Sequence, residues 1–109
     1  MKEKILLIFC TVATEADARL MAQRILTKKL AACCTFMPVV TSLYHWQGRV
    51  EESQETLLLI KTTQKKYNQL EKEIQMLHTY EVPEIIAVNI EEASPAYVDW
   101  LIENVDTPG

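Results

Sequence analysis

Residues 41–48 read Thr-Ser-Leu-Tyr-His-Trp-Gln-Gly, a strand-like run that ends in a turn glycine. The run extends backward through Cys33–Trp46, which is rich in β-branched and aromatic residues, and forward through Arg49–Thr62. Two such runs joined by Gln47-Gly48 predict a long β-hairpin. At about 3.3 Å per residue its strands reach roughly 40 Å, more than a core of this size needs. We expect the surplus length to project and pair with another surface.

Two aromatic side chains gather near the tip of this predicted hairpin. Tyr44 and Trp46 are costly to leave in water, so they must pack on their own domain, meet another subunit or line a ligand cleft. His45 lies between them in sequence and should face away from both, toward solvent. Pro38 removes one ladder donor, which indicates an edge strand or a bulge.

The chain before the hairpin predicts one strand and one helix. Ile5–Phe9 is an unbroken apolar run, typical of a strand covered on both faces. Thr14 with Asp17 resembles a capping box, and apolar residues then repeat at helical spacing, which predicts a helix to about Leu30.

The chain after the hairpin predicts a helix, a strand and a short terminal helix. Thr63 is a candidate cap for the first helix, whose apolar positions are Tyr67, Leu70, Ile74 and Leu77. His78 falls at the end of that helix. Glu84–Ile90 is the predicted fourth strand, and Ser94-Pro95 begins the terminal helix. Its apolar stripe is Val98, Leu101, Ile102 and Val105.

The predicted order is β-α-β-β-α-β plus a C-terminal helix, the split βαβ or ferredoxin-like arrangement of the α+β class. Helices then cover one face of an antiparallel sheet. We expect residues 1–109 to form a single domain, with no linker or repeat. Because this architecture hosts many unrelated activities, the fold does not give the function.

Composition excludes several classes of partner. The chain is 49% hydrophobic with a net charge of −4, and its basic residues are scattered among acids, so we expect no nucleic-acid partner. It has no long apolar run and no charged-then-apolar leader at Met1–Leu7, so we expect no membrane partner. Its two glycines, Gly48 and Gly109, leave no glycine-rich cradle for an organic cofactor. An odd number of cysteines, three, indicates a reducing, cytoplasmic setting.

Three cysteines and two histidines are the candidates for metal chemistry. Cys10, where the first strand runs into a loop, is either a soft-metal ligand or a small buried apolar residue. Cys33 and Cys34 are adjacent, so on a strand they point to opposite faces and are interpreted as core or interface residues. His78 is either a cap at a helix C-terminus or a ligand.

Four polar residues permit a catalytic interpretation. Lys61, Tyr80, Glu81 and Glu84 form a set that supplies a general base and charge if strand ends and the second helix bring them together. A solvated rim explains the two glutamates equally well. We therefore expect no enzymatic activity.

Several separate motifs, in order, resemble the CutA family of divalent-cation-tolerance proteins. The resemblance covers about Ile5 to Val105 and rests on Cys10-Thr11, Lys29-Leu-Ala-Ala-Cys33, Thr41–Gly48, Leu59-Ile-Lys-Thr62, His78-Thr-Tyr-Glu-Val-Pro-Glu-Ile-Ile86 and Tyr97-Val-Asp-Trp-Leu101. It implies a fold similar to that of PII signalling proteins, assembled as a homotrimer whose long hairpins pair between subunits.

The resemblance also implies metal binding and an inter-subunit cleft. Copper binding in some members is attributed to a cysteine ending the first strand and two histidines after the second helix. Cys10 and His78 match two of these three, whereas Leu77 occupies the place of the other histidine. The cleft residues implied by the resemblance are Tyr44, Trp46, Lys61, Tyr80 and Glu84.

Two functions of different classes follow from these observations. The first is a trimeric protein of divalent-cation tolerance that binds copper, or another divalent metal, through Cys10 and His78 without turnover. The alternative is a PII-like sensor of a small molecule, or an assembly scaffold, that acts at the inter-subunit cleft.

Overall fold

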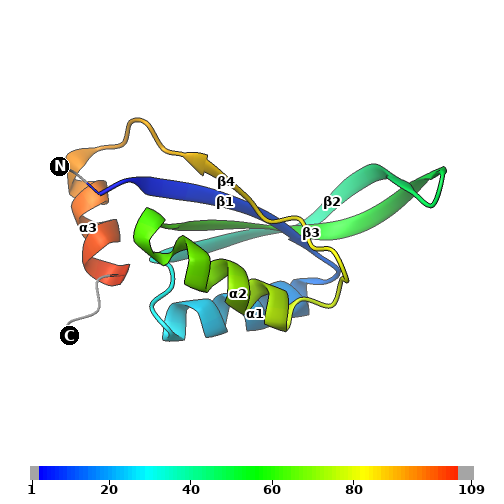
Figure 1. Ribbon diagram of the computed structural model, residues 1–109, viewed down its shortest axis with the longest axis horizontal. Coiled ribbons are helices and arrows are strands. Elements are labelled where there is room, and N and C mark those ends of the chain that lie inside the picture. Colours follow the sequence, from blue (N-terminus) through cyan, green and yellow to red (C-terminus); the bar gives the residue numbers. More distant parts are fainter. Residues whose placement is uncertain (1–2, 106–109) are drawn as a thin grey trace.

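The computed structural model describes residues 3–105, with elements in the order β1-α1-β2-β3-α2-β4-α3 (Figure 1). Their bounds are β1 Ile5–Val12, α1 Glu15–Thr27, β2 Cys33–Trp46, β3 Arg49–Thr63, α2 Tyr67–Leu77, β4 Ile86–Asn89 and α3 Pro95–Val105, with a 3-10 turn at Gln64–Lys66 before α2. The predicted α+β order is confirmed. Met1 and Gly109 lie outside the described residues. No helix within residues 3–105 is long and apolar enough to cross a membrane.

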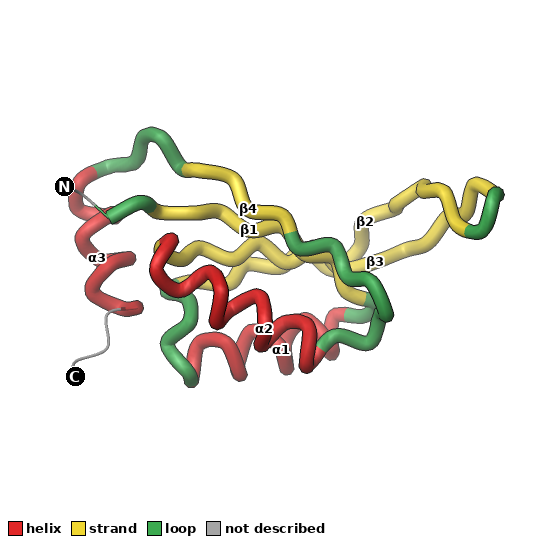
Figure 2. Tube along the Cα trace, viewed as in Figure 1, coloured by secondary structure: helices red, strands yellow, loops and turns green. Residues whose placement is uncertain are grey.

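The four strands form one antiparallel sheet in the order β2-β3-β1-β4. Figure 2 shows α1 and α2 together on one side of it, while α3 lies at the end opposite the hairpin tip. Side chains alternate along β1 and β3, so one face of each strand meets the helices. The core there includes the fully buried residues Ile8, Cys10, Ile25, Leu58, Ile60, Leu70 and Ile74.

The opposite face, here called the open face, carries Leu7, Phe9, Leu57, Leu59 and Lys61, which remain half-buried. The expectation that Ile5–Phe9 would be covered on both faces holds at Ile5 and Leu6, which are both buried, and is wrong at Leu7 and Phe9, which stay half-buried. Helices α1 and α2 stand on one side of the sheet, whereas α3 contacts β3 on the open face, where the Lys61 ammonium lies 5.8 Å from the Tyr97 ring centroid.

The β2–β3 hairpin is confirmed, and it projects beyond the helices (Figure 1). Trp46 pairs with Arg49, and the two turn residues have positive φ, 50° at Gln47 and 79° at Gly48. Positive φ at both positions is the type I′ geometry whose twist suits a two-residue hairpin. The molecule is 46 Å along its longest axis.

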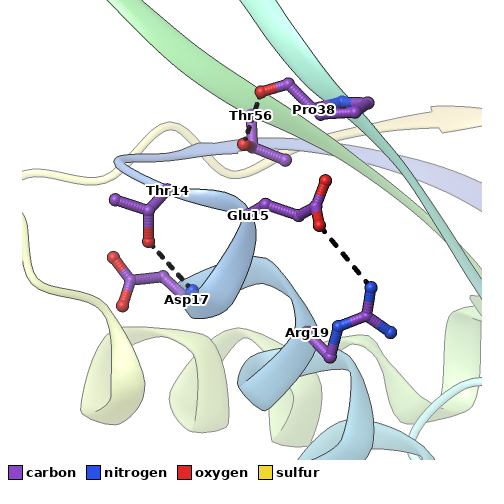
Figure 3. A network of polar contacts seen from close by, with 6 residues as sticks. All are labelled: Thr14, Glu15, Asp17, Arg19, Pro38 and Thr56. Atoms are coloured by element: carbon purple, nitrogen blue, oxygen red, sulfur yellow. Dashed lines mark hydrogen bonds and ion pairs between the residues drawn. The ribbon is translucent and has the colours of Figure 1, made fainter.

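The bulge expected near Pro38 is present. The register between β2 and β3 shifts between Met37 and Val40, and β2 is an edge strand. The Thr56 hydroxyl donates a 2.9 Å hydrogen bond to the Pro38 carbonyl, as Figure 3 shows. The bulge therefore keeps this backbone carbonyl paired although the ladder is interrupted.

Helix α1 begins as predicted but ends early. The Thr14 hydroxyl accepts a bond from the Asp17 backbone N–H, and Glu15 pairs with Arg19 one turn on (Figure 3). The predicted end near Leu30 is wrong, because Lys29 has a φ of 56° and the Leu30 N–H bonds back to the Ile25 carbonyl. This is a Schellman ending, with Leu30 buried against the helix end.

Two further boundaries differ from the prediction. Thr63 does not cap α2: it is the buried last residue of β3, its side chain makes no capping bond, and the 3-10 turn follows it. Strand β4 is shorter than Glu84–Ile90 because only its four residues pair with β1. All four are exposed, as expected at a sheet edge.

Candidate functional site

Cys10 lies inside β1 and is fully buried among core residues. The sequence placed it at the strand end, but the strand continues to Val12. Burial is the largest cause that raises the pKa of its thiol to about 12, and the charges of Glu84 and Glu55 add to it. The thiol is therefore protonated at neutral pH, and its sulfur lies 3.9 Å from the Thr11 carbonyl oxygen.

His78 follows α2, and both of its ring nitrogens are hydrogen-bonded. Nε2 lies 2.8 Å from the Thr11 carbonyl oxygen, and Nδ1 accepts the Tyr80 backbone N–H at 3.0 Å. A carbonyl can only accept, so Nε2 carries the proton and the ring is the neutral Nε2–H tautomer. The His78 backbone N–H also bonds to the Ile74 carbonyl, which makes this residue a helix C-cap.

The fold brings Cys10 and His78, 68 residues apart in sequence, to the same backbone atom. The Cys10 sulfur, at 3.9 Å, and the His78 Nε2, at 2.8 Å, both contact the Thr11 carbonyl oxygen. Leu77, which immediately precedes His78, packs against the core. No three histidine, cysteine or acidic side chains in residues 3–105 are gathered closely enough to hold a metal ion.

A buried carboxylate extends this arrangement. Glu55 is only 7% exposed, and its Oε2 accepts the Tyr80 hydroxyl at 2.7 Å. Burial first, then this bond, raises the pKa of the Tyr80 phenol. The Tyr80 ring also packs on the His78 ring, with centroids 4.6 Å apart. Tyr80 is thus held by its backbone, its ring and its hydroxyl.

A cleft of about 680 Å³ lies between the hairpin and the loop after α2. The hairpin contributes Ser42, Leu43, Tyr44, Trp46 and Glu55. The loop contributes Tyr80, Glu81, Val82 and Glu84, and β1 contributes Thr11. We call this the hairpin cleft. Sequence motifs far apart along the chain therefore meet in one concave surface.

Four of the five residues assigned to a cleft from the resemblance line it within one chain. Tyr44, Trp46, Tyr80 and Glu84 do so, but Lys61 does not. Its ammonium lies 5.8 Å from the centroid of the Tyr97 ring of α3, on the open face. The four residues with a possible catalytic role are likewise divided: Tyr80, Glu81 and Glu84 line the hairpin cleft, whereas Lys61 does not.

Sequence reasoning missed Glu55 and Thr11. The signal for Glu55 was present, because it is the last acid before the apolar second half of β3. A charged residue there has either to be paired or to border a cleft, and Glu55 does both. Thr11 contributes mainly a backbone oxygen, and residue type gives no signal for that.

The remaining candidates lie away from the cleft. Cys33 and Cys34 are half-buried free thiols, and Cys34 packs against the core on the helix side. Burial is the largest cause that raises the pKa of the Cys34 thiol to about 12, and the charge of the neighbouring Cys33 adds to it. His45 is exposed, as predicted.

Known proteins resemble the chain in sequence and structure. The family model described as CutA1 divalent ion tolerance protein matches residues 6–104. The divalent-cation tolerance protein CutA of Thermus thermophilus is 46% identical over 102 residues, covering 94% of this chain and 97% of the relative.

Solved structures of CutA proteins have a similar fold. CutA from Xylella fastidiosa has a TM-score of 0.91 at 36% identity, covering 94% of this chain and 98% of the other. The periplasmic divalent cation tolerance protein CutA from Archaeoglobus fulgidus has a TM-score of 0.91 at 31% identity, covering 94% and 99%. From the matched model and these relatives, the chain belongs to the CutA1 divalent ion tolerance family.

Proposed function

We propose that this protein serves divalent-cation tolerance as a cytoplasmic, homotrimeric metal-binding protein without enzymatic turnover. The observation that carries the metal proposal is the convergence of the Cys10 thiol and the His78 imidazole on the Thr11 carbonyl oxygen. A thiolate with an imidazole is a donor pair that suits soft or borderline metals, Cu(I) above all and then Cu(II) and Zn²⁺. These two residues would hold the metal.

Metal binding at this pair requires two protons to move. The Cys10 thiol must release its proton, and Nε2 of His78 must exchange its proton for the metal. A neutral imidazole that binds metal through Nε2 carries its proton on Nδ1, where the Tyr80 N–H now donates. Metal binding through Nε2 would therefore replace the hydrogen bond from the Tyr80 backbone N–H to Nδ1 and shift the loop after α2.

The nearby carboxylates favour a cation here. Glu84 and Glu55 are close enough to disfavour the Cys10 thiolate when no cation is present. The same charges attract a metal ion, which then stabilises the thiolate. Leu77 supplies no donor, and no third histidine, cysteine or acidic side chain among residues 3–105 is close enough to form a cluster with the pair, so Cys10 and His78 are the two ligands proposed.

The trimer is supported by surfaces that the chain leaves uncovered. The open face keeps apolar residues half-buried, and the projecting hairpin exposes Val39 and Val50, which do not line the hairpin cleft. The edge strand β4 exposes Ile86 and Val88. Exposed large apolar side chains in this number favour an association surface. Light scattering at micromolar concentration tests the proposal, and a 12.5 kDa monomer alone would overturn it.

Calorimetric titration tests the metal site, with Cu(II) in air and with Cu(I) under anaerobic conditions. We expect the Cys10→Ala/His78→Ala double variant to lose the tight phase of binding. The matched control is Cys33→Ala/His45→Ala, which removes the same two donor types elsewhere and should titrate like the parent protein. Unchanged binding in the first double variant would remove Cys10 and His78 from the site.

A second candidate function is favoured by the hairpin cleft. A concave surface of about 680 Å³ with aromatic and carboxylate lining has the size of a small-molecule site. The protein would then act as a PII-like sensor or scaffold whose ligand binds there. A thermal-shift screen separates the two functions, because a ligand that prefers the folded state raises the melting temperature by mass action.

A further inference from the structure

The hairpin cleft combines aromatic walls with acidic side chains. Tyr44, Trp46 and Tyr80 supply three aromatic rings, and Glu55, Glu81 and Glu84 supply three carboxyl groups. Among the described residues that line the cleft, none is lysine, arginine or histidine. A bound molecule would therefore meet negative charge from the carboxylates and from the electron-rich faces of the rings, which favours a cation.

Two of the three rings are held in place before any ligand arrives. The Tyr44 hydroxyl and the Ser53 hydroxyl lie 2.8 Å apart in a hydrogen bond across the hairpin. Tyr80 is fixed by its bond to Glu55 and by its contact with the His78 ring. Side chains held in this way lose little conformational entropy on binding. Trp46, half exposed at 51%, is the ring with the most surface left to bury.

The size and lining of the cleft favour an organic cation over a metal ion. A volume of about 680 Å³ lies within the range of small-molecule sites and far exceeds one ion. The three carboxylates do not form a ready metal cluster among residues 3–105. Leu43 and Val82 add apolar surface that a hydrated metal ion would not use.

We propose that the hairpin cleft binds an organic ammonium ion with apolar substituents, its charge between the rings and Glu84 and its apolar body against Trp46. This rests on the second candidate function, ligand binding at the cleft, and names the chemistry of that ligand. Because copper binding at Cys10 and His78 would shift the loop that carries Tyr80, ammonium binding is measured in metal-free protein.

Choline is a suitable probe, because 3,3-dimethylbutan-1-ol has nearly its shape without the charge. Binding is followed by tryptophan fluorescence in Trp100→Phe, which leaves Trp46 as the reporter. We expect choline to change the fluorescence saturably and the alcohol to bind at least about tenfold more weakly. Phenyltrimethylammonium should bind more tightly than choline because it buries more apolar surface.

A matched pair of variants tests the location. Glu84→Gln should weaken choline binding by about fivefold to tenfold. Glu92→Gln makes the same charge change at an exposed glutamate that lines a different cavity, so it should leave choline binding unchanged. Equal weakening in both variants would show attraction by net charge alone and overturn the proposal.

Failure of the proposal differs visibly from failure of the proposed function. If the neutral alcohol or inorganic phosphate binds as tightly as choline, and calorimetric titration shows that Trp46→Leu abolishes that binding, the cleft is a ligand site but not one for ammonium ions. If no probe saturates below about 10 mM, both the ammonium proposal and the small-molecule function fail. Neither result decides whether Cys10 and His78 bind copper, which the separate metal titration tests.

Discussion

The two faces of the sheet are built from the same strands, yet only one is finished within the chain. Ile60 faces α1 and α2 and is fully buried, whereas its neighbour Leu59 faces the other way and stays half-buried. The same contrast separates Ile8 from Phe9 on β1. A single chain thus completes the core on the helix side and leaves a second apolar surface, the open face, for association.

Truncation of Ile60 should have the largest effect. Ile60→Ala leaves a cavity in a fully packed region, so we expect a loss of about 2–5 kcal/mol in the free energy of unfolding. Urea denaturation monitored by circular dichroism measures it.

Leu59→Ala is the matched control on the open face. We expect a loss of about 1 kcal/mol that increases with protein concentration, because assembled chains would cover this face. Equal losses for the two variants at every concentration would show that one chain buries both faces, and the comparison would fail.

The dependence of unfolding free energy on alkaline pH should also distinguish the two faces of the sheet, because the adjacent thiols of Cys33 and Cys34 point to opposite faces. The pKa of Cys34 rises from an ordinary 9.0 to about 12 because it is buried on the helix side. A raised pKa gives stability that is fully present below pH 9 and is lost as pH rises toward 12. Cys34→Ala should therefore flatten the decline in unfolding free energy over that window.

Cys33→Ala provides the control for this experiment, because Cys33 pairs with Lys61 and faces away from the helices. Its decline above pH 9 should stay close to that of the parent protein, because burial, the larger cause of the raised Cys34 pKa, is unchanged. Identical pH profiles for the parent and for Cys34→Ala would contradict burial of the Cys34 thiol.

Gly48→Ala tests the hairpin beyond the helices. A Cβ at this position would meet nothing within 4 Å, so its cost comes only from the positive φ of 79°. We expect a loss of about 1 kcal/mol by thermal denaturation. A much larger loss would mean that the tip is packed against another subunit where Gly48 has no space for a side chain.

The smallest expected effect is a gain at the end of α1. Lys29 adopts a left-handed conformation that glycine tolerates better, so Lys29→Gly should stabilise the protein by about 0.5–1 kcal/mol. Lys28→Gly is the control and should destabilise, because Lys28 has a negative φ of −85° and its side chain pairs with Glu73. A loss for Lys29→Gly would argue against the Schellman ending.

Local signals predicted most of the elements but not their ends. The hairpin at Gln47-Gly48 followed from strand propensity and a turn glycine. The predicted end of α1 was wrong, because residue type gives no signal that a lysine, Lys29, will adopt the left-handed conformation. About half of the candidate site was predictable, because the aromatic and acidic residues of the cleft stood out in the sequence. That Lys61 lies apart from them, against Tyr97 of α3, depends on how α3 packs on the sheet.

The sequence by itself determined the order of elements, the long hairpin and the family, because these depend on periodicity, turn chemistry and residue identity along the chain. Only the tertiary structure decided that Cys10 and His78 meet at the Thr11 carbonyl oxygen and that Glu55 is buried beneath Tyr80. Such contacts join residues far apart in sequence. They depend on strand register and loop path, which are set by packing of the whole chain.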